Sequence, residues 1–267
     1  MNLKELRKLI KEDREFENRN FTDDELFIVY RYINLRDLDE DPDYKPELRT
    51  VADQLEIVFV PKGTYGKTLE RERKLANIST LGTDNYLLEA SLVDFVLIDE
   101  ERKEAYLRAS RFIEAIKSGQ TQKGLFLHGS YGTGKTFLLS CMVHELAKFK
   151  KVVFVYFPDL VRYIKSTIQT NELEAKIKEL KMTDILVIDD VGSENMSAWF
   201  RDEVLSPVLQ FRLASSLPVL ISSNFTQKDL VEFFAEEKDG IGMVKASRVV
   251  HRIRELTSEV PLKSRYL

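Results

Sequence analysis

The sequence predicts an α/β fold, with a parallel sheet flanked by helices, preceded by a small and mainly helical N-terminal domain. From Ala90 onward, short apolar segments alternate with amphipathic ones, the pattern of a parallel sheet covered on both faces. The first fifty residues instead have charged helical periodicity. The phosphate-loop pattern G-x-x-x-x-G-K-[ST] is matched at every fixed position by Gly129-Ser130-Tyr131-Gly132-Thr133-Gly134-Lys135-Thr136.

The composition predicts a soluble, cytoplasmic protein with no membrane partner. The length of 267 residues suits one large domain or two small ones. The composition, 43% hydrophobic and 31% charged, predicts a packed soluble core. No run of about eighteen apolar residues occurs, and the N-terminus is charged rather than signal-like. The single cysteine, Cys141, excludes an internal disulfide and a cysteine-based zinc site.

Charge is distributed unevenly along the chain. Residues 1–50 contain ten Lys or Arg and fourteen Asp or Glu, and so account for the entire net charge of −4. Residues 241–267 contain six basic and two acidic side chains. An acidic front and a basic tail suggest two surfaces with different partners, although ordinary solvated faces would give the same counts.

The predicted N-terminal domain covers residues 1–50. Residues 2–19 and Asp23–Leu35 have the periodicity of two amphipathic helices, and the acidic, proline-containing Asp37–Asp43 predicts an exposed linker. Fifty residues bury little core alone, so we expect apolar surface to remain for docking a partner. The alternative is an appendage that packs on the main domain.

Residues 51–89 are predicted to form a strand and a charged linker. Leu55–Val60 alternates and is β-branched, which is typical of a strand. Gly66-Lys67-Thr68 imitates the end of a phosphate loop, but Pro61 stands where the first glycine is required, so we predict no site there. Thr68–Leu75 is predicted to be a charged helix or linker.

We expect the matched loop to bind nucleotide phosphates. Leu125–His128 before it predicts a buried strand, and Phe137–Phe149 after it predicts a helix. In this arrangement backbone N–H groups and a helix N-terminus converge on phosphate. Lys135 should reach the β- and γ-phosphates, and the Thr136 hydroxyl should hold Mg²⁺. The residues expected to contact the nucleotide are Gly129, Ser130, Tyr131, Gly132, Thr133, Gly134, Lys135 and Thr136.

The other elements of this part of the chain alternate in type. The predicted strands are Val152–Tyr156, Ile185–Ile188 and Val219–Ser222, with a short strand-like tail at the end. The predicted helices are Glu101–Lys117, Pro158–Ile168, Asn171–Leu180, Ser197–Arg212 and a basic helix at Arg248–Leu256.

Polar side chains follow two of these strands. Asp189 could hold Mg²⁺, and Asp190 could orient or deprotonate the attacking water. Glu194 could share the role of the base, or it could cap the following helix. Asn224 ends the next strand, where its amide could contact the γ-phosphate and the water, or could simply form a turn.

Two pairs of basic side chains are candidates for phosphate contacts. Arg248 and Arg252 are spaced i, i+4 on one helix face, and an arginine supplied across a subunit contact can stabilise transition-state charge. Arg162 and Lys165 lie near aromatic side chains and could grip single-stranded nucleic acid. Solvated helix faces are the alternative for both pairs.

Five segments carry a resemblance to a known family: Gly129–Thr136, Ile185–Glu194, Ser197–Val204, Ser222–Phe225 and His251–Ile253. Together they resemble the bacterial replicative-helicase loaders of the DnaI and DnaC type, which are AAA+ ATPases. The resemblance is strong from about residue 90 to the end and faint before it. The helix that contains Trp199 is its most discriminating part.

The resemblance implies a P-loop AAA+ ATPase domain over residues 90–267 that uses ATP and Mg²⁺. It implies that the chain binds the hexameric replicative DNA helicase through its N-terminal piece and helps place the helicase on single-stranded DNA. Other primosome proteins and self-association through the AAA+ domains are also implied. The roles implied for single residues are Walker A for Lys135 and Thr136, Walker B for Asp189 and Asp190, sensor 1 for Asn224, arginine finger for Arg252 or as second choice Arg248, and DNA contact for Arg162 and Lys165.

Two departures from the family pattern affect these expectations. Such loaders often carry a cysteine-rich zinc site in the N-terminal domain, and this chain has no cysteine there. Many AAA+ proteins have Glu where this chain has Asp190, whose shorter side chain implies slow hydrolysis. An IstB-like transposition ATPase, a nucleotide-binding adaptor with negligible hydrolysis and a small-molecule kinase are the alternative functions, and the basic C-terminal helix gives the kinase no support.

Overall fold

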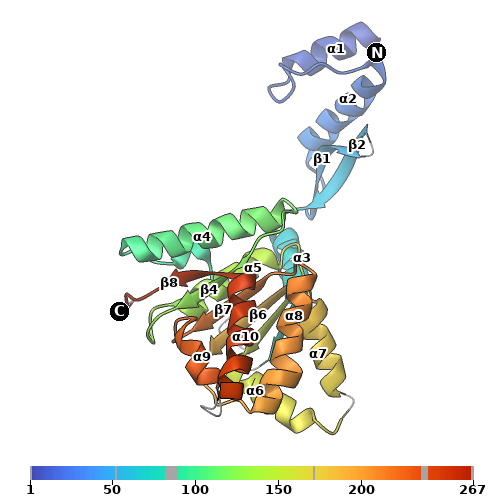
Figure 1. The fold of residues 1–267 in the computed structure, drawn as a ribbon. Helices are drawn as coiled ribbons and strands as arrows, with labels where there is room; N and C mark the ends of the chain where they lie inside the picture. Colours follow the sequence, from blue (N-terminus) through green and yellow to red (C-terminus); the bar gives the residue numbers. More distant parts are fainter. Residues whose placement is uncertain (1, 52, 82–89, 171, 236–239, 266–267) are drawn as a thin grey trace. The chain divides into compact units, whose positions relative to one another are not determined.

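The computed structural model describes residues 2–51, 53–81, 90–170, 172–235 and 240–265 (Figure 1). The chain divides into two compact units, residues 1–72 and residues 73–267. Among the described helices, none combines the length and the apolar character that crossing a bilayer requires.

Two helices begin the first unit. α1 (Leu3–Glu12) starts with a capping box, in which the Asn2 side chain accepts from the Glu5 N–H while the Glu5 carboxylate accepts from the Asn2 N–H. It ends well before the predicted limit at residue 19, because Asp13 adopts an extended backbone. α2 (Asp23–Leu38) matches the second predicted helix and continues slightly beyond it.

A hairpin follows α2 in the first unit and corrects the predicted domain boundary. β1 (Tyr44–Val51) and β2 (Gln54–Pro61) pair in antiparallel fashion, and α3 (Gly63–Ala76) follows. The predicted domain end at residue 50 lies inside β1, and the compact unit runs on to residue 72. The sequence did not predict β1 because its one fully buried residue is Pro46, and proline within a run argues against a strand.

A small apolar core joins the helices of this unit to the hairpin. The buried side chains come from both helices and the turn between them, and three hairpin residues pack against them. The buried residues are Ile10, Phe16, Leu26, Val29 and Tyr32, and the hairpin residues are Leu48, Leu55 and Ile57.

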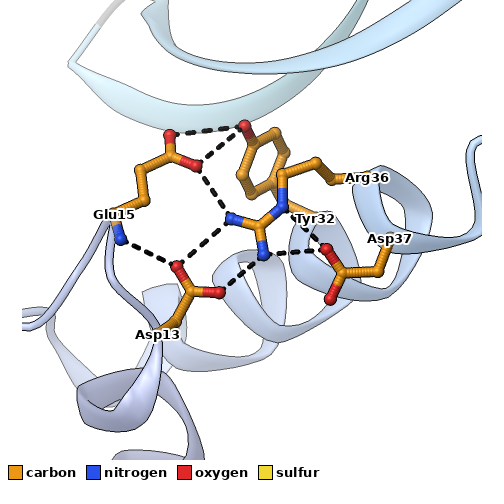
Figure 2. A network of polar contacts seen from close by, with 5 residues as sticks. All are labelled: Asp13, Glu15, Tyr32, Arg36 and Asp37. Atoms are coloured by element: carbon orange, nitrogen blue, oxygen red, sulfur yellow. Dashed lines mark hydrogen bonds and ion pairs between the residues drawn. The ribbon is translucent and has the colours of Figure 1, made fainter.

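Arg36 fixes the turn after α1 to the side of α2 (Figure 2). Its guanidinium donates to Asp13 Oδ2 at 2.6 Å, to Glu15 Oε2 at 2.9 Å and to Asp37 Oδ1 at 2.9 Å. The hydrogen bond from Arg36 lowers the pKa of Asp13 below its ordinary value, and the same bond raises the pKa of Arg36. Tyr32 also donates to Glu15 at 3.3 Å, so four side chains of this network surround one cation.

A six-stranded parallel sheet forms the centre of the second unit, which confirms the predicted fold class. The strand order is β3-β5-β6-β7-β4-β8, so the strand that leads into the phosphate loop, β4, lies between β7 and β8. The strands are β3 (Ile78–Leu81), β4 (Gly124–His128), β5 (Val152–Tyr156), β6 (Ile185–Val191), β7 (Val219–Ser223) and β8 (Thr257–Pro261).

Two apolar cores lie on opposite faces of this sheet. Val153 and Val155 of β5 belong to one core, and Val152 and Phe154 belong to the other, because successive strand residues point to opposite faces. The second core also takes side chains from α4 (Glu100–Lys117) and α5 (Lys135–Leu146), which follow the 3₁₀ turn Leu92–Asp94 and the phosphate loop. The first core takes them from α6 (Phe157–Thr167), α7 (Glu172–Met182), α8 (Ser206–Ala214), α9 (Asp229–Phe234) and α10 (Gly240–Leu256).

The helix predicted at Ser197–Arg212 is interrupted in the structure. Phe200–Leu205 is π-helical, and the Ser206 N–H donates to the Arg201 carbonyl five residues before it. Pro207 follows at the start of α8, and because proline has no N–H, a regular α-helical ladder cannot pass through this point.

Two further elements differ from the prediction. β3 precedes the predicted start of the sheet region at Ala90, and its four residues form an edge strand too short to give a clear pattern. α10 begins at Gly240, well before the predicted start at Arg248.

Candidate nucleotide-binding site

The phosphate loop lies between β4 and α5, as the motif predicts. Gly132 and Gly134 have positive φ angles of 74° and 90°, a conformation that glycine adopts without a steric penalty. A Cβ on Gly132 would meet no heavy atom within 4 Å, whereas a Cβ on Gly129 would lie 1.8 Å from the Leu262 carbonyl oxygen. The loop is therefore tightly packed where it leaves the strand at Gly129 and open around Gly132.

Lys135 begins α5 and is almost fully buried. Its ammonium donates to the carbonyl oxygens of Gly129 and Ser130, both at 2.8 Å, and to Asn224 Oδ1 at 2.9 Å. Burial lowers the pKa of Lys135, while the nearby carboxylates of Asp190 and Asp189 oppose that shift. The side chain is thus held inside the loop, with its charge between the start of the loop and Asn224.

Asp189 lies at the carboxyl end of β6, facing the start of α5. It accepts hydrogen bonds from the Thr136 hydroxyl, at 2.9 and 3.1 Å, and from the Ser222 hydroxyl. Burial raises the pKa of Asp189, and the hydrogen bonds from Ser222 and Thr136 oppose the increase. A hydroxyl and a carboxylate side by side are the oxygen ligands that Mg²⁺ prefers, so Thr136 and Asp189 fit the predicted metal role.

Asp190 adopts a left-handed backbone conformation, with φ of 58°. The register between β6 and β7 shifts between Ile188 and Val191, so a bulge turns the Asp190 side chain out of the regular alternation. The Ser222 hydroxyl accepts from the Asp190 N–H at 2.8 Å, and Asn224 Nδ2 donates to Asp190 Oδ1 at 3.1 Å. The bulge therefore aims the carboxylate at Asn224 and, through it, at Lys135.

Five of the predicted residues belong to one hydrogen-bonded network, in which Ser222 connects the two aspartates. Asn224 accepts from the lysine and donates to the second aspartate, and the threonine contacts the first aspartate. They come from the loop, from β6 and from the residue after β7, elements that are neighbours in the sheet (Figure 1). The five are Lys135, Thr136, Asp189, Asp190 and Asn224.

Arg252 and Arg248 lie elsewhere, in a groove of about 630 Å³ between α8 and α10. Arg252 donates to Gln210 Oε1 at 2.7 Å and to the Ser206 hydroxyl at 2.9 Å, so α8 fixes its guanidinium. Arg248 is exposed in the same groove, beside His251. Both arginines are therefore outside the phosphate-loop network of this chain.

Arg162 and Lys165 are both exposed on α6. Arg162 donates to Asp159 at 2.8 Å, and its guanidinium lies 3.7 Å from the Glu194 carboxylate. Glu194, the alternative base, is thus paired with a cation of α6 rather than with the phosphate-loop network.

Three residues near the loop were missed at the level of sequence. Ser222 contacts both aspartates, and Tyr156 donates to Asp190 Oδ2 at 3.4 Å. Arg102 of α4 donates to the Thr133 carbonyl, inside the loop. The sequence does contain an indication for Arg102. It lies at helical spacing from Ala105 and Ala109, so its charged side chain falls on the buried face of α4.

Comparisons with known proteins point to one family. Residues 87–237 match the bacterial DnaA ATPase domain. The replicative helicase loader DnaI of Bacillus subtilis (strain 168) is 30% identical over 266 residues, which cover 95% of this chain and 86% of that protein. A crystal structure of DnaI is 37% identical, with a TM-score of 0.64 over 70% of this chain and 98% of that one.

A third relative is a putative primosome component from Streptococcus pyogenes serotype M3, whose crystal structure is 29% identical and has a TM-score of 0.61. The match covers 73% of this chain and 97% of that chain. These matches agree with the parallel sheet and with the loop geometry. The chain therefore belongs to the DnaI-type replicative helicase loaders, and its second unit carries an AAA+ domain of the bacterial DnaA ATPase type.

Proposed function

We propose that this chain is an ATP-dependent loader that binds the hexameric replicative helicase and helps deliver it onto single-stranded DNA. The observation that carries the proposal is the network in which Asn224 links Lys135 to Asp190 while Thr136 contacts Asp189. Such a network serves phosphate binding, metal binding and water activation at one edge of the sheet. The membership of the chain in the loader family supports the choice of helicase as partner.

Each residue of the network has a role in this proposal. Lys135 and the loop N–H groups bind the β- and γ-phosphates of ATP, and Thr136 with Asp189 holds Mg²⁺. When bound there, Mg²⁺ would supply positive charge against the phosphates. Asp190 accepts a proton from the attacking water, which Asn224 orients through its amide. Because Asn224 already contacts both Lys135 and Asp190, it can register whether the γ-phosphate is present.

The other contacts of the loader are assigned to separate surfaces. The first unit docks on the helicase, supported by the exposed apolar side chains of Phe27, Leu38 and Phe59. The exposed cations Arg162 and Lys165 contact the DNA backbone. The α8–α10 groove, with Arg252 and Arg248, faces the nucleotide bound by a neighbouring copy of the chain. Other primosome proteins are further partners of the loader.

Lys135→Ala tests the nucleotide part of the proposal. We expect titration calorimetry with MgATP to detect binding to the unaltered chain and a loss of at least roughly a hundredfold in the variant, since a desolvated cation is removed from the phosphates. Helicase loading onto single-stranded DNA should fall with it. Lys148→Ala is the control, because Lys148 is exposed and pairs with Glu145 further along the same segment. Full loading activity in Lys135→Ala would refute a nucleotide-driven mechanism.

A further inference from the structure

Arg102 connects three parts of the second unit through one buried side chain. Only 2% of its surface is exposed. Its Nε donates to the Val96 carbonyl at 2.6 Å, and its Nη1 donates to the Thr133 carbonyl at 2.5 Å. The guanidinium carbon also lies 4.3 Å from the centre of the Phe95 ring. A helix, the segment before that helix and the phosphate loop therefore meet at one cation.

The contact with Thr133 controls the direction of a neighbouring N–H group. The peptide that joins Thr133 to Gly134 is trans and planar, so its carbonyl and its N–H point in opposite directions. Because Arg102 holds the carbonyl oxygen, the Gly134 N–H points away from Arg102. Gly134 caps the N-terminus of α5, where the backbone N–H groups of a phosphate loop face the ligand.

The hydrogen bond from Arg102 to the Thr133 carbonyl also makes the Gly134 N–H a stronger hydrogen-bond donor. A hydrogen bond from a cation to a carbonyl polarises the peptide group, and the effect is larger where water is excluded. Thr133 is fully buried, and its hydroxyl donates to the Ser130 carbonyl at 3.0 Å, which closes the loop on itself. Thr133 is thus anchored to the loop through its hydroxyl and to α4 through its carbonyl, which accepts from Arg102.

The packing around Gly134 leaves the cation little freedom. A Cβ on Gly134 would lie 3.4 Å from Arg102 Nη2 and 3.7 Å from the Phe95 ring. Phe95 stacks in turn on Phe137 of α5, with ring centres 6.5 Å apart and planes 13° apart. The segment that contains Phe95 and Val96 therefore contacts both α5, through Phe137, and α4, through Arg102.

We propose that Arg102 is a positioning residue for nucleotide binding, which aims the Gly134 N–H at the phosphates by holding the Thr133 carbonyl. The role rests on the proposed binding of MgATP at this loop. Arg102 does not contact the nucleotide; it acts through the Thr133–Gly134 peptide. Replacing Arg102 should consequently lower the affinity for the phosphates by more than a loss of fold stability alone would.

The test compares the full-length chain with Arg102→Met and Arg102→Lys in calorimetric titrations with MgATP. We expect a roughly tenfold loss of affinity in Arg102→Met, the effect of one misdirected hydrogen bond to a charged ligand. Arg102→Lys should recover part of this loss, because an ammonium can still donate to the Thr133 carbonyl.

Two control variants separate positioning from folding. Arg111→Met removes an exposed cation from the same helix and should bind MgATP normally. Ile113→Ala opens a cavity in the core beside α4 and should lower the thermal unfolding temperature without changing the affinity. Arg102→Met and Ile113→Ala should have comparable unfolding temperatures, but only Arg102→Met should lose affinity for MgATP.

The outcomes distinguish this role from the proposed function. If the unaltered chain binds no MgATP, the proposed function fails. If it binds and Arg102→Met binds equally well, the positioning role is refuted while the proposed function stands. The role is also refuted if Arg102→Lys is no better than Arg102→Met, or if Ile113→Ala loses as much affinity as Arg102→Met.

Discussion

The two units of this chain use polar side chains in different ways. In residues 1–72, ion pairs such as those of Arg36 lie at or near the surface, above one small apolar core. In residues 73–267, two apolar cores surround buried polar side chains with several partners each, among them Arg102, Asp189, Arg201, Arg212 and Ser222.

The difference teaches where geometry is fixed in this molecule. A surface ion pair contributes little, so its loss changes little else. A buried polar group must keep its partners, because an unpaired one costs on the order of 1–3 kcal/mol. The unit with the candidate nucleotide site is therefore the one in which single polar contacts hold the backbone in place, and the predictions below test that contrast through the free energy of unfolding.

Replacing Arg212 should have the largest effect. The side chain is fully buried, and burial lowers its pKa to about 9, so it remains charged at pH 7. Arg212→Met should lower the free energy of unfolding of the second unit by about 3 kcal/mol, because five buried or partly buried carbonyls lose their donor. These are the carbonyls of Leu180, Lys181, Thr183, Asp184 and Pro218, at 2.7–3.2 Å.

Trp199 provides the measurement for this prediction. It is the single tryptophan of the chain and belongs to the second unit, so its fluorescence during urea unfolding follows that unit alone. Arg254→Met, an exposed arginine of α10, is the control and should leave the unfolding midpoint unchanged. Equal midpoints for the two variants would show that the buried contacts of Arg212 do not contribute to the stability of the second unit.

Replacing Arg36 should have a smaller and pH-dependent effect. The folded-state pKa of Asp13 lies below its ordinary value of 3.8, so its bond to Arg36 stabilises the fold above that pH and is lost as the pH falls through the lowered pKa. At pH 7, Arg36→Met should cost about 1 kcal/mol in the opening of α2. Near pH 2 the difference between the variant and the unaltered chain should shrink.

Hydrogen exchange of the α2 amides, corrected for the intrinsic rate at each pH, measures this cost. Arg31→Met is the control on the same helix. A penalty for Arg36→Met that stays the same at both pH values would mean that the charge of Asp13 does not contribute.

Replacing Phe27 should have the smallest effect on stability. Phe27 is 57% exposed on α2, so Phe27→Ser should change the free energy of unfolding by less than about 0.5 kcal/mol. It should nevertheless weaken binding to the replicative helicase, measured by surface plasmon resonance, if the first unit docks there. Met182→Ser removes a similarly exposed side chain, 59% exposed, from the second unit and should bind normally. Equal binding by both variants would argue against the docking role of the first unit.

The elements predictable from sequence are those with a contiguous signal. β5 has the predicted bounds, Val152–Tyr156, because five consecutive apolar residues cannot be mistaken for an exposed segment. The phosphate loop and the loader family were predicted from short motifs, and the family is confirmed by the relatives. The roles of Asp190, Asn224, Arg248, Arg252, Arg162 and Lys165 stay predictions.

The features that were missed depend on contacts between distant residues. Arg102 and Thr133 are 31 positions apart, and Ser222 and Asp190 are 32 apart, so no local pattern records either contact. β1 contains a proline, and β3 is a short edge strand, so neither has the apolar alternation on which prediction relies. The bulge at Asp190 arises only when β6 pairs with β7.

The contact between Gly129 and Leu262 has a consequence for biosynthesis. The Leu262 carbonyl fills the space beside Gly129, the first glycine of the loop. The Leu262 N–H donates to the His128 carbonyl at 2.7 Å. More than a hundred residues separate the motif from Leu262. The ribosome must therefore synthesise all of them before the turn at Gly129 can pack against Leu262. We expect nascent chains stalled before Thr257 to retain no ATP, and chains released after Leu262 to retain it.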